Sequence, residues 1–155
     1  MKFLCGLLCL LPALAFAGTA KVAVKLNPAG DFTAKTGKVR GFVERVDGGY
    51  IARDIGFAVG SLDSDQDTRN DHMWKELGGK DAKISIKEAK GSAGRGTGIL
   101  VVKNIAKPFS FSYTEKSGIV SAKFPIKFSE YGIKPSFLGV GVEDMGEIEA
   151  DIPVR

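Results

Sequence analysis

The sequence predicts an all-β fold, an antiparallel barrel of about eight strands with one short helix near residues 65–77. Two observations support this. Apolar and polar residues alternate over most of the chain, and short segments rich in Gly, Pro, Asn or Asp separate the alternating runs. A period of two is typical of strands with one buried and one exposed face. Successive hairpins favour a meander, and closing a meander of this length into a barrel removes exposed sheet edges.

The alternating runs predict strands at residues 21–26, 54–59, 82–87, 109–114, 120–128 and 147–154. Turns are expected at residues 27–30, 47–49, 91–98, 115–118 and 143–146.

The segment GSAGRGTG, residues 91–98, invites comparison with a phosphate-binding loop. It lacks the Gly-Lys-Ser/Thr ending of a P-loop, and strand residues rather than a helix follow it. We therefore predict a hairpin turn, in which Gly96 and Gly98 mark strong bending of a strand.

One segment, residues 65–77, breaks the period of two. Trp74 and Leu77 fall three residues apart, as on one face of a helix, and Gly78-Gly79 is a suitable helix end. Three residues are suited to cap the start of this helix: Asp65, Asp67 and Thr68.

The first 17 residues have the pattern of a secretory signal peptide: Lys2, an apolar run, and Ala15-Phe16-Ala17 before the expected cleavage site. We expect cleavage after Ala17, a single domain over residues 18–155, and a periplasmic location. Cys5 and Cys9 lie in the leader, so the mature chain is expected to have no disulfide, thiol nucleophile or cysteine metal site.

The formal net charge is +4, and the basic residues are spread along the sequence. Nucleic-acid-binding proteins usually concentrate basic charge on one face or helix, so a nucleic-acid partner is not expected.

The stretch from Ser61 to Leu77 holds the only histidine and the only tryptophan. Its Asp-x-Asp-x-Asp start resembles a calcium loop, but Thr68 and Trp74 stand where that loop needs Gly and a bidentate Glu. His72 alone cannot form the usual zinc site, and there is no Gly-x-Ser-x-Gly nucleophile elbow. We predict no catalytic residue, no metal site and no cofactor.

Three stretches resemble the YceI-like lipid/polyisoprenoid-binding family. Ser61-Leu62-Asp63 with 69–73 (RNDHM) resembles the family's S-I-D-T…R-D-x-H signature. Residues 98–108 (GILVVKNIAKP) resemble its G-x-L-T-I-x-G-V-x-K-P strand pair. Residues 124–133, 140–144 and 147–152 resemble its closing part. Together the similarity spans roughly residues 39–154.

This resemblance implies an extended lipocalin-like barrel, exported to the periplasm, whose lumen holds a polyisoprenoid, an isoprenoid quinone or a fatty acyl lipid. The resemblance is also compatible with transient contact with a membrane or a membrane enzyme, and with a homodimer. Arg69, His72 and Trp74 are candidates for the mouth. The lumen candidates are Phe57, Val59, Leu100, Val102, Phe109, Phe111, Tyr113, Phe124, Phe128, Ile148 and Ile152.

The sequence departs from the family at Asn70, where Asp is usual, and at residues 74–79, which replace an aromatic stretch. Two alternatives to a lipid carrier remain at this point. One is a filled barrel that binds a partner or acts in stress protection. The other is a hydrolase or isomerase that uses His72 as a catalytic residue. A single histidine on a short helix is more often a packing or hydrogen-bonding residue than a catalytic one.

Overall fold

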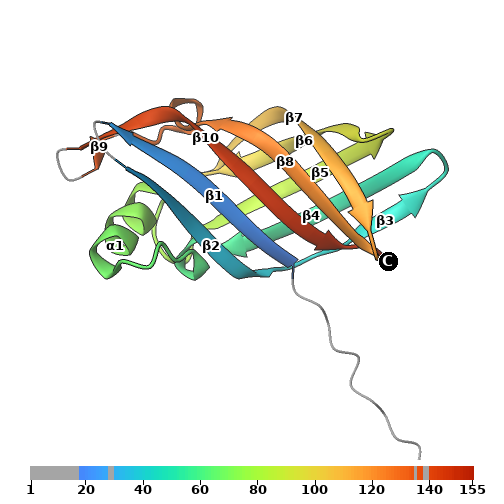
Figure 1. The fold of residues 1–155 in the computed structure, drawn as a ribbon, viewed down its shortest axis with the longest axis horizontal. Coiled ribbons are helices and arrows are strands. Elements are labelled where there is room, and N and C mark those ends of the chain that lie inside the picture. Colours follow the sequence, from blue (N-terminus) through green and yellow to red (C-terminus); the bar gives the residue numbers. More distant parts are fainter. Residues whose placement is uncertain (1–17, 28–29, 135, 138–139) are drawn as a thin grey trace, which may run out of the picture.

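The computed structural model describes residues 18–27, 30–134, 136–137 and 140–155 (Figure 1). The expected signal peptide lies outside these residues. The strands and helices are β1 Gly18–Asn27, β2 Asp31–Val39, β3 Val43–Val46, β4 Gly49–Ala58, η1 Val59–Ser61, α1 Asp67–Glu76, β5 Lys83–Ser92, β6 Arg95–Val102, β7 Ile105–Lys116, β8 Ile119–Lys127, η2 Phe128–Tyr131, β9 Ser136–Phe137 and β10 Val140–Pro153.

The strands form one antiparallel sheet in the order β2-β1-β10-β8-β7-β6-β5-β4-β3, with β9 paired to β10 off this path. The sheet curls until β2 meets β4, where Arg40 and Gly56 exchange two backbone hydrogen bonds of 2.8 and 3.1 Å. The prediction of an antiparallel all-β barrel-like fold is confirmed. The path has nine strands rather than about eight.

The sequence pattern missed β2 because its inward positions carry small residues. Ala34 and Thr36 are 1% and 5% exposed, so they face the interior, yet neither stands out as a large apolar residue. The Thr36 hydroxyl lies 2.8 Å from the Ser61 hydroxyl, which joins the strand to η1.

The turn expected at residues 143–146 was wrong, because these residues lie inside β10. The hairpin turns at residues 93–94 and 117–118 have the expected chemistry. Ala93 and Gly94 both have positive φ, as do Ser117 and Gly118, which is the backbone of a two-residue type I′ turn. The segment 91–98 is therefore a hairpin connection, as predicted. A further pair with positive φ, Lys103-Asn104, connects β6 and β7.

The pairing of β7 with β8 stops halfway. It covers only Ser112–Lys116 against Ile119–Lys123. The first half of β7 pairs with β6 alone, while the second half of β8 pairs with β10. The two strands separate toward the end of the barrel that carries η2, and the rings of Phe109 and Phe124, with centroids 4.5 Å apart, bridge the space between them.

Helix α1 runs from Asp67 to Glu76, close to the predicted range. The predicted caps were wrong: Gln66 is the N-cap, and no side chain caps the helix start. Gly78 and Gly79 end the helix as expected, with φ near +100°, and the Gly79 N–H donates to the Trp74 carbonyl at 2.8 Å.

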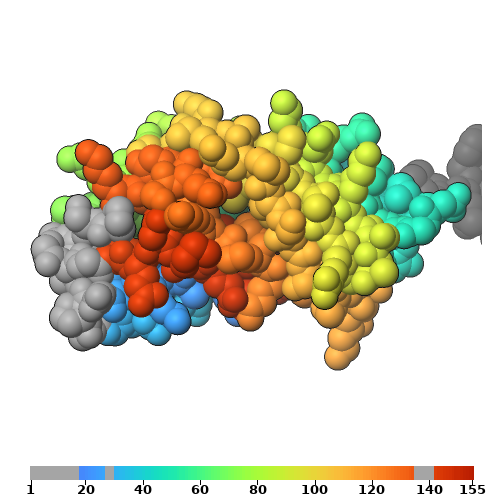
Figure 2. Space-filling model, turned by 90° about the horizontal axis from the view of Figure 1, so that it is seen from above, coloured from blue at the N-terminus to red at the C-terminus, as the bar shows by residue number. Residues whose placement is uncertain are grey.

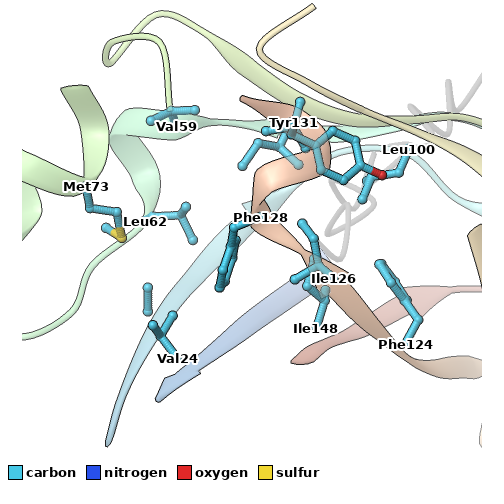
Figure 3. Close-up of a cluster of buried hydrophobic side chains, with 13 residues drawn as sticks. Val24, Val59, Leu62, Met73, Leu100, Phe124, Ile126, Phe128, Tyr131 and Ile148 are labelled. Atoms are coloured by element: carbon cyan, nitrogen blue, oxygen red, sulfur yellow. The ribbon is translucent and has the colours of Figure 1, made fainter. Parts of the chain in front are cut away.

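The interior contains two clusters of buried apolar side chains. The α1-end cluster includes Val59, Leu62, Met73, Phe124 and Phe128, and Figure 3 shows Phe128 between the helix side and the strand residues. The β3-end cluster, at the opposite end of the barrel, consists of Ala20, Val39, Val43, Ile55, Val120, Ala150 and Ile152.

Candidate ligand-binding site

A cavity runs through the interior of the barrel and touches both apolar clusters. Its volume is about 120 Å³. Its wall comes from β1, β2, β4, β5, β6, β8 and β10, together with α1 and the residues after η2. Nearly every lining residue is apolar, so this space is suited to a hydrocarbon rather than to a polar substrate.

The structure places most of the lumen candidates in this wall. The lining candidates are Phe57, Leu100, Val102, Phe124, Phe128, Ile148 and Ile152. They come from β4, β6, β8, η2 and β10, and the inward positions of the alternating runs bring them together. All except Phe57 are less than 10% exposed.

Four candidates do not line the cavity. Val59 is fully buried in the α1-end cluster, where packed side chains surround it. Phe109, Phe111 and Tyr113 point inward from β7, and their rings pack over glycines of β5 and β6. A Cβ added at Gly98 would lie 2.8 Å from the Phe109 ring, so the glycine makes room for it.

These rings belong to an aromatic row that crosses the interior. The row consists of Phe124, Phe109, Phe111, Tyr113 and Tyr50, with successive ring centroids 4.5, 5.5, 6.1 and 5.6 Å apart. Gly96 and Gly98 have a packing role, because a side chain at either position would collide with a ring. The bending role predicted for them stays a prediction.

Sequence reasoning missed many wall residues. Most of them, such as Val24, Ile84 and Ile126, stand in the alternating runs, so the period itself could have identified them. The choice of candidates favoured aromatic residues over aliphatic ones at equivalent positions. Phe32 and Ala34 were missed because β2 was not recognised as a strand.

Helix α1 contributes Met73, Glu76 and Leu77 to the wall. Their spacing of three and four residues places them on one face of the helix. This periodicity was visible in the sequence, where only Trp74 and Leu77 were noted.

None of the three mouth candidates lines the cavity. The Arg69 guanidinium lies 4.5 Å from the centroid of the Phe32 ring. The Trp74 indole N–H donates to the Leu62 carbonyl at 2.9 Å, and the Lys80 ammonium lies 4.7 Å from the Trp74 ring centroid. Arg69 and Trp74 therefore fasten the helix to the barrel, while His72 is on the exposed face of the helix.

The aspartates before α1 form a structural turn. The Asn70 carbonyl oxygen accepts hydrogen bonds from the Ser64 N–H at 2.8 Å and the Ser64 hydroxyl at 2.7 Å. The Asn70 amide donates to Asp63 at 2.9 Å, and the Asp65 N–H donates to the same carboxylate. These donors lower the pKa of Asp63, the Asn70 amide having the largest effect.

Polar groups in the cavity wall are few. Glu76 and Lys134 belong to the end that carries α1, while Gly56 and Ser85 belong to β4 and β5. An amphiphilic ligand would find charged partners for its head group only at the α1 end. Near this end, η2 is held to β10 because the Ser129 N–H and hydroxyl both donate to Asp144, at 2.7 and 2.6 Å.

In the described part of the chain, no cluster of three or more His, Cys, Asp or Glu side chains could hold a metal ion. No helix among these residues is long and apolar enough to cross a membrane.

The barrel resembles two solved structures at low sequence identity. The Burkholderia cenocepacia protein BcnA shares 14% identity with a TM-score of 0.63, and the match covers 86% of this chain and 94% of that one. A polyisoprenoid-binding domain from Saccharophagus degradans, implicated in plant cell wall breakdown, shares 10% identity with a TM-score of 0.60, covering 88% and 92%. These likenesses show a shared fold.

A search of curated proteins gave no significant match. The family model described as the YceI-like domain matches residues 14–154, nearly the whole chain. The resemblance carried by the three sequence motifs is thereby confirmed, and the chain belongs to the YceI-like family.

Proposed function

We propose that this protein is a periplasmic carrier that holds a long apolar ligand in the barrel lumen, without catalysing a reaction. The ligand class is a polyisoprenoid, an isoprenoid quinone or a fatty acyl lipid. The observation that carries this proposal is the continuous apolar wall of the cavity, which draws on seven strands and one helix. Family membership and the polyisoprenoid-binding domain of similar fold support it.

The energetics favour a hydrocarbon guest. Each methylene moved from water into an apolar space contributes about 0.8 kcal/mol, so a ten-carbon tail contributes roughly 8 kcal/mol before the entropic cost of binding. A prenyl or acyl tail has no hydrogen-bonding groups along its length, and the cavity wall has few polar groups that would need a hydrogen-bond partner. A polar head group would remain near Glu76 and Lys134 at the α1 end.

The volume of the cavity limits which ligands fit without rearrangement of the wall. Pockets for drug-sized ligands have volumes of about 300–1,000 Å³, and an apolar cavity of about 150 Å³ accommodates benzene. At about 120 Å³, this cavity admits a long tail only if wall side chains change rotamer or move outward. Met73, Leu77 and Ile133 can do so without breaking a strand pair, because none of them belongs to a strand.

The test is to express the protein with its own leader, purify it from the periplasm without detergent, and analyse an organic extract by mass spectrometry. We expect about one prenyl or acyl lipid per protein molecule. A variant with a narrowed wall, Ala34→Phe, serves as the matched control, since Ala34 is buried and lines the cavity. It should carry less lipid while remaining folded by circular dichroism.

A second candidate follows from the small volume and the aromatic row. In that case the barrel is filled, and the protein acts through a partner or in stress protection. A lipid-free extract from folded wild-type protein, together with no binding of added polyprenol, would contradict the carrier proposal and favour the filled barrel.

A further inference from the structure

Three consecutive strands, β5 to β7, carry most of the excess positive charge. Residues 83–112 contain only one acidic residue, Glu88. Their net charge of +5 exceeds the +4 of the whole chain, so the positive charge is concentrated in this segment. The even spread of basic residues predicted from the sequence was wrong. All of the basic residues are exposed except Lys103, which is half-buried. They are Lys83, Lys87, Lys90, Arg95, Lys103 and Lys107.

The outer face of these strands also presents apolar side chains. Leu100 is 3% exposed and points inward, so its neighbours Ile99 and Val101 point outward. Across the β6–β7 ladder they pair with Pro108 and Ala106, both exposed. Lys107 stands opposite the inward Leu100 in the β6–β7 ladder, so it does not belong to the outer face. The other basic residues accompany a small strip of outward apolar residues, which we call the β6–β7 strip. Figure 2 shows the molecule from above, with β6 and β7 among the strands on this side.

The outer face of β1, β10 and β8 differs from that of β5–β7 in its charge balance. Its positive charges are matched by carboxylates: the Lys123 ammonium lies 3.0 Å from Glu147 and 3.5 Å from Glu149. These carboxylates raise the pKa of Lys123, and the largest cause is the hydrogen bond that Lys123 donates to Glu147. Lys21 stands opposite Glu149 in the β1–β10 ladder. This face has little net charge to attract a polyanion.

Basic side chains around an apolar strip fit an anionic lipid surface. Lysines attract negatively charged head groups, while apolar side chains gain by entering the boundary between head groups and acyl chains. The phosphates of a nucleic acid would pair with the basic side chains, but they would offer no apolar partner to Ile99, Val101 and Pro108. We propose that the outer face of β5–β7 docks on a membrane containing anionic lipids. This rests on the proposed lipid-carrier function, which requires access to a membrane.

The test uses sedimentation with vesicles of phosphatidylethanolamine and phosphatidylglycerol, and with neutral phosphatidylcholine vesicles. We expect binding to the anionic vesicles alone, weakening as salt is raised because the charges are exposed. Each lysine near such a surface contributes about 1 kcal/mol, so Lys87→Gln with Lys90→Gln should reduce the partition coefficient roughly 30-fold. Ile99→Ser should reduce it by a smaller factor.

The matched control is Lys25→Gln with Lys35→Gln, which removes the same charge from exposed positions on β1 and β2. It should change vesicle binding less than threefold. Equal losses in the two double variants would overturn the proposal, since net charge alone would then explain binding. So would absence of vesicle binding, or binding to heparin without binding to vesicles. The vesicles contain no polyprenol, so these outcomes leave lipid extraction as a separate test of the lumen.

Discussion

The two ends of the barrel are closed by different kinds of interaction. At the β3 end, backbone hydrogen bonds join the strands: Arg40 with Gly56, Val154 with Gly118, and the Arg155 N–H to the Val43 carbonyl at 2.8 Å. At the α1 end, closure depends on side chains of α1 and of the residues after η2, including Met73, Leu77 and Ile133.

Opening the β3 end requires breaking strand pairing. At the α1 end, two backbone hydrogen bonds of 2.9 Å join Lys35 to Asp63 ahead of the helix, and beyond them this end can open when side chains and the short helix move. The aromatic row strengthens this difference, because Tyr50 and Tyr113 pack edge to face near the β3 end. The ion pair between Arg45 and Glu115 also links β3 to β7 there. A ligand should therefore enter and leave past α1. The following predictions test this difference, from the largest expected effect to the smallest.

Phe124→Ala should have the largest effect, because Phe124 joins the aromatic row to the cavity wall and is 3% exposed. Removing a buried ring typically costs about 3–5 kcal/mol in the free energy of unfolding. Urea denaturation measures this loss. Ile126→Val, two residues along the same strand, should cost about 1 kcal/mol. A loss for Phe124→Ala as small as that of the control would show that the row contributes little.

Gly98→Ala tests how the aromatic row packs against the sheet. The new methyl group would meet the Glu88 carbonyl oxygen at 2.7 Å and the Phe109 ring at 2.8 Å, so strands or ring must shift. We expect a loss of about 2 kcal/mol, as for other overpacked interiors. The control is Gly37→Ala on β2, where no atom lies within 4 Å of the new methyl group and φ is not positive. If both variants unfold at the same urea concentration, the close approach of ring and glycine is unimportant.

Asn70→Ala tests the α1 end. It removes the buried amide that holds Ser64 and Asp63, leaving the buried Ser64 groups without that acceptor, at a cost of about 1–2 kcal/mol. Hydrogen exchange should become faster in α1 and stay unchanged in β6 and β7. Faster exchange throughout the barrel would contradict the idea that this end opens independently.

The smallest effect concerns pH. Hydrogen bonds from Asn70 to Asp63 and from Ser129 to Asp144 lower the pKa of both carboxyl groups below the usual value near 3.8. Each contributes stability that is fully present above pH 4 and is lost as the pH falls through the lowered pKa. Asp144→Asn should reduce the loss of stability between pH 4 and pH 2. A thermal denaturation series over this range would detect it, and an unchanged pH dependence would argue against the Asp144 contribution.

Much of the fold was accessible from the sequence because alternation reports directly which strand face is buried. Runs such as 120–128 and 147–154 identified β8 and β10 with their inward residues. β2 escaped notice since two of its inward positions carry the small residues Ala34 and Thr36. Alternation cannot reveal how wide the interior is at each point.

The site was harder to predict for the same reason. Phe109 and Phe111 have the inward period of lumen residues, yet glycines on the neighbouring strand bring their rings against the sheet instead of into the cavity. That outcome depends on the β6–β7 register, which joins Gly98 to Phe109 and Gly96 to Phe111. Arg69 and Trp74 were predicted at the mouth, and their ring and backbone contacts keep them out of the cavity wall.

The pairing of β1 with β10 also affects how the chain folds. Thr19 lies opposite Asp151 in this ladder, 132 residues apart in the sequence. Joining segments so far apart in the sequence costs a large loop-closure entropy. Chains whose contacts are mostly between residues distant in the sequence fold slowly. β2 and β10 flank β1, so the first strand completes its pairing only after the last one has been synthesised. Until then the emerging chain keeps an unsatisfied strand edge, and its final residues decide when folding ends.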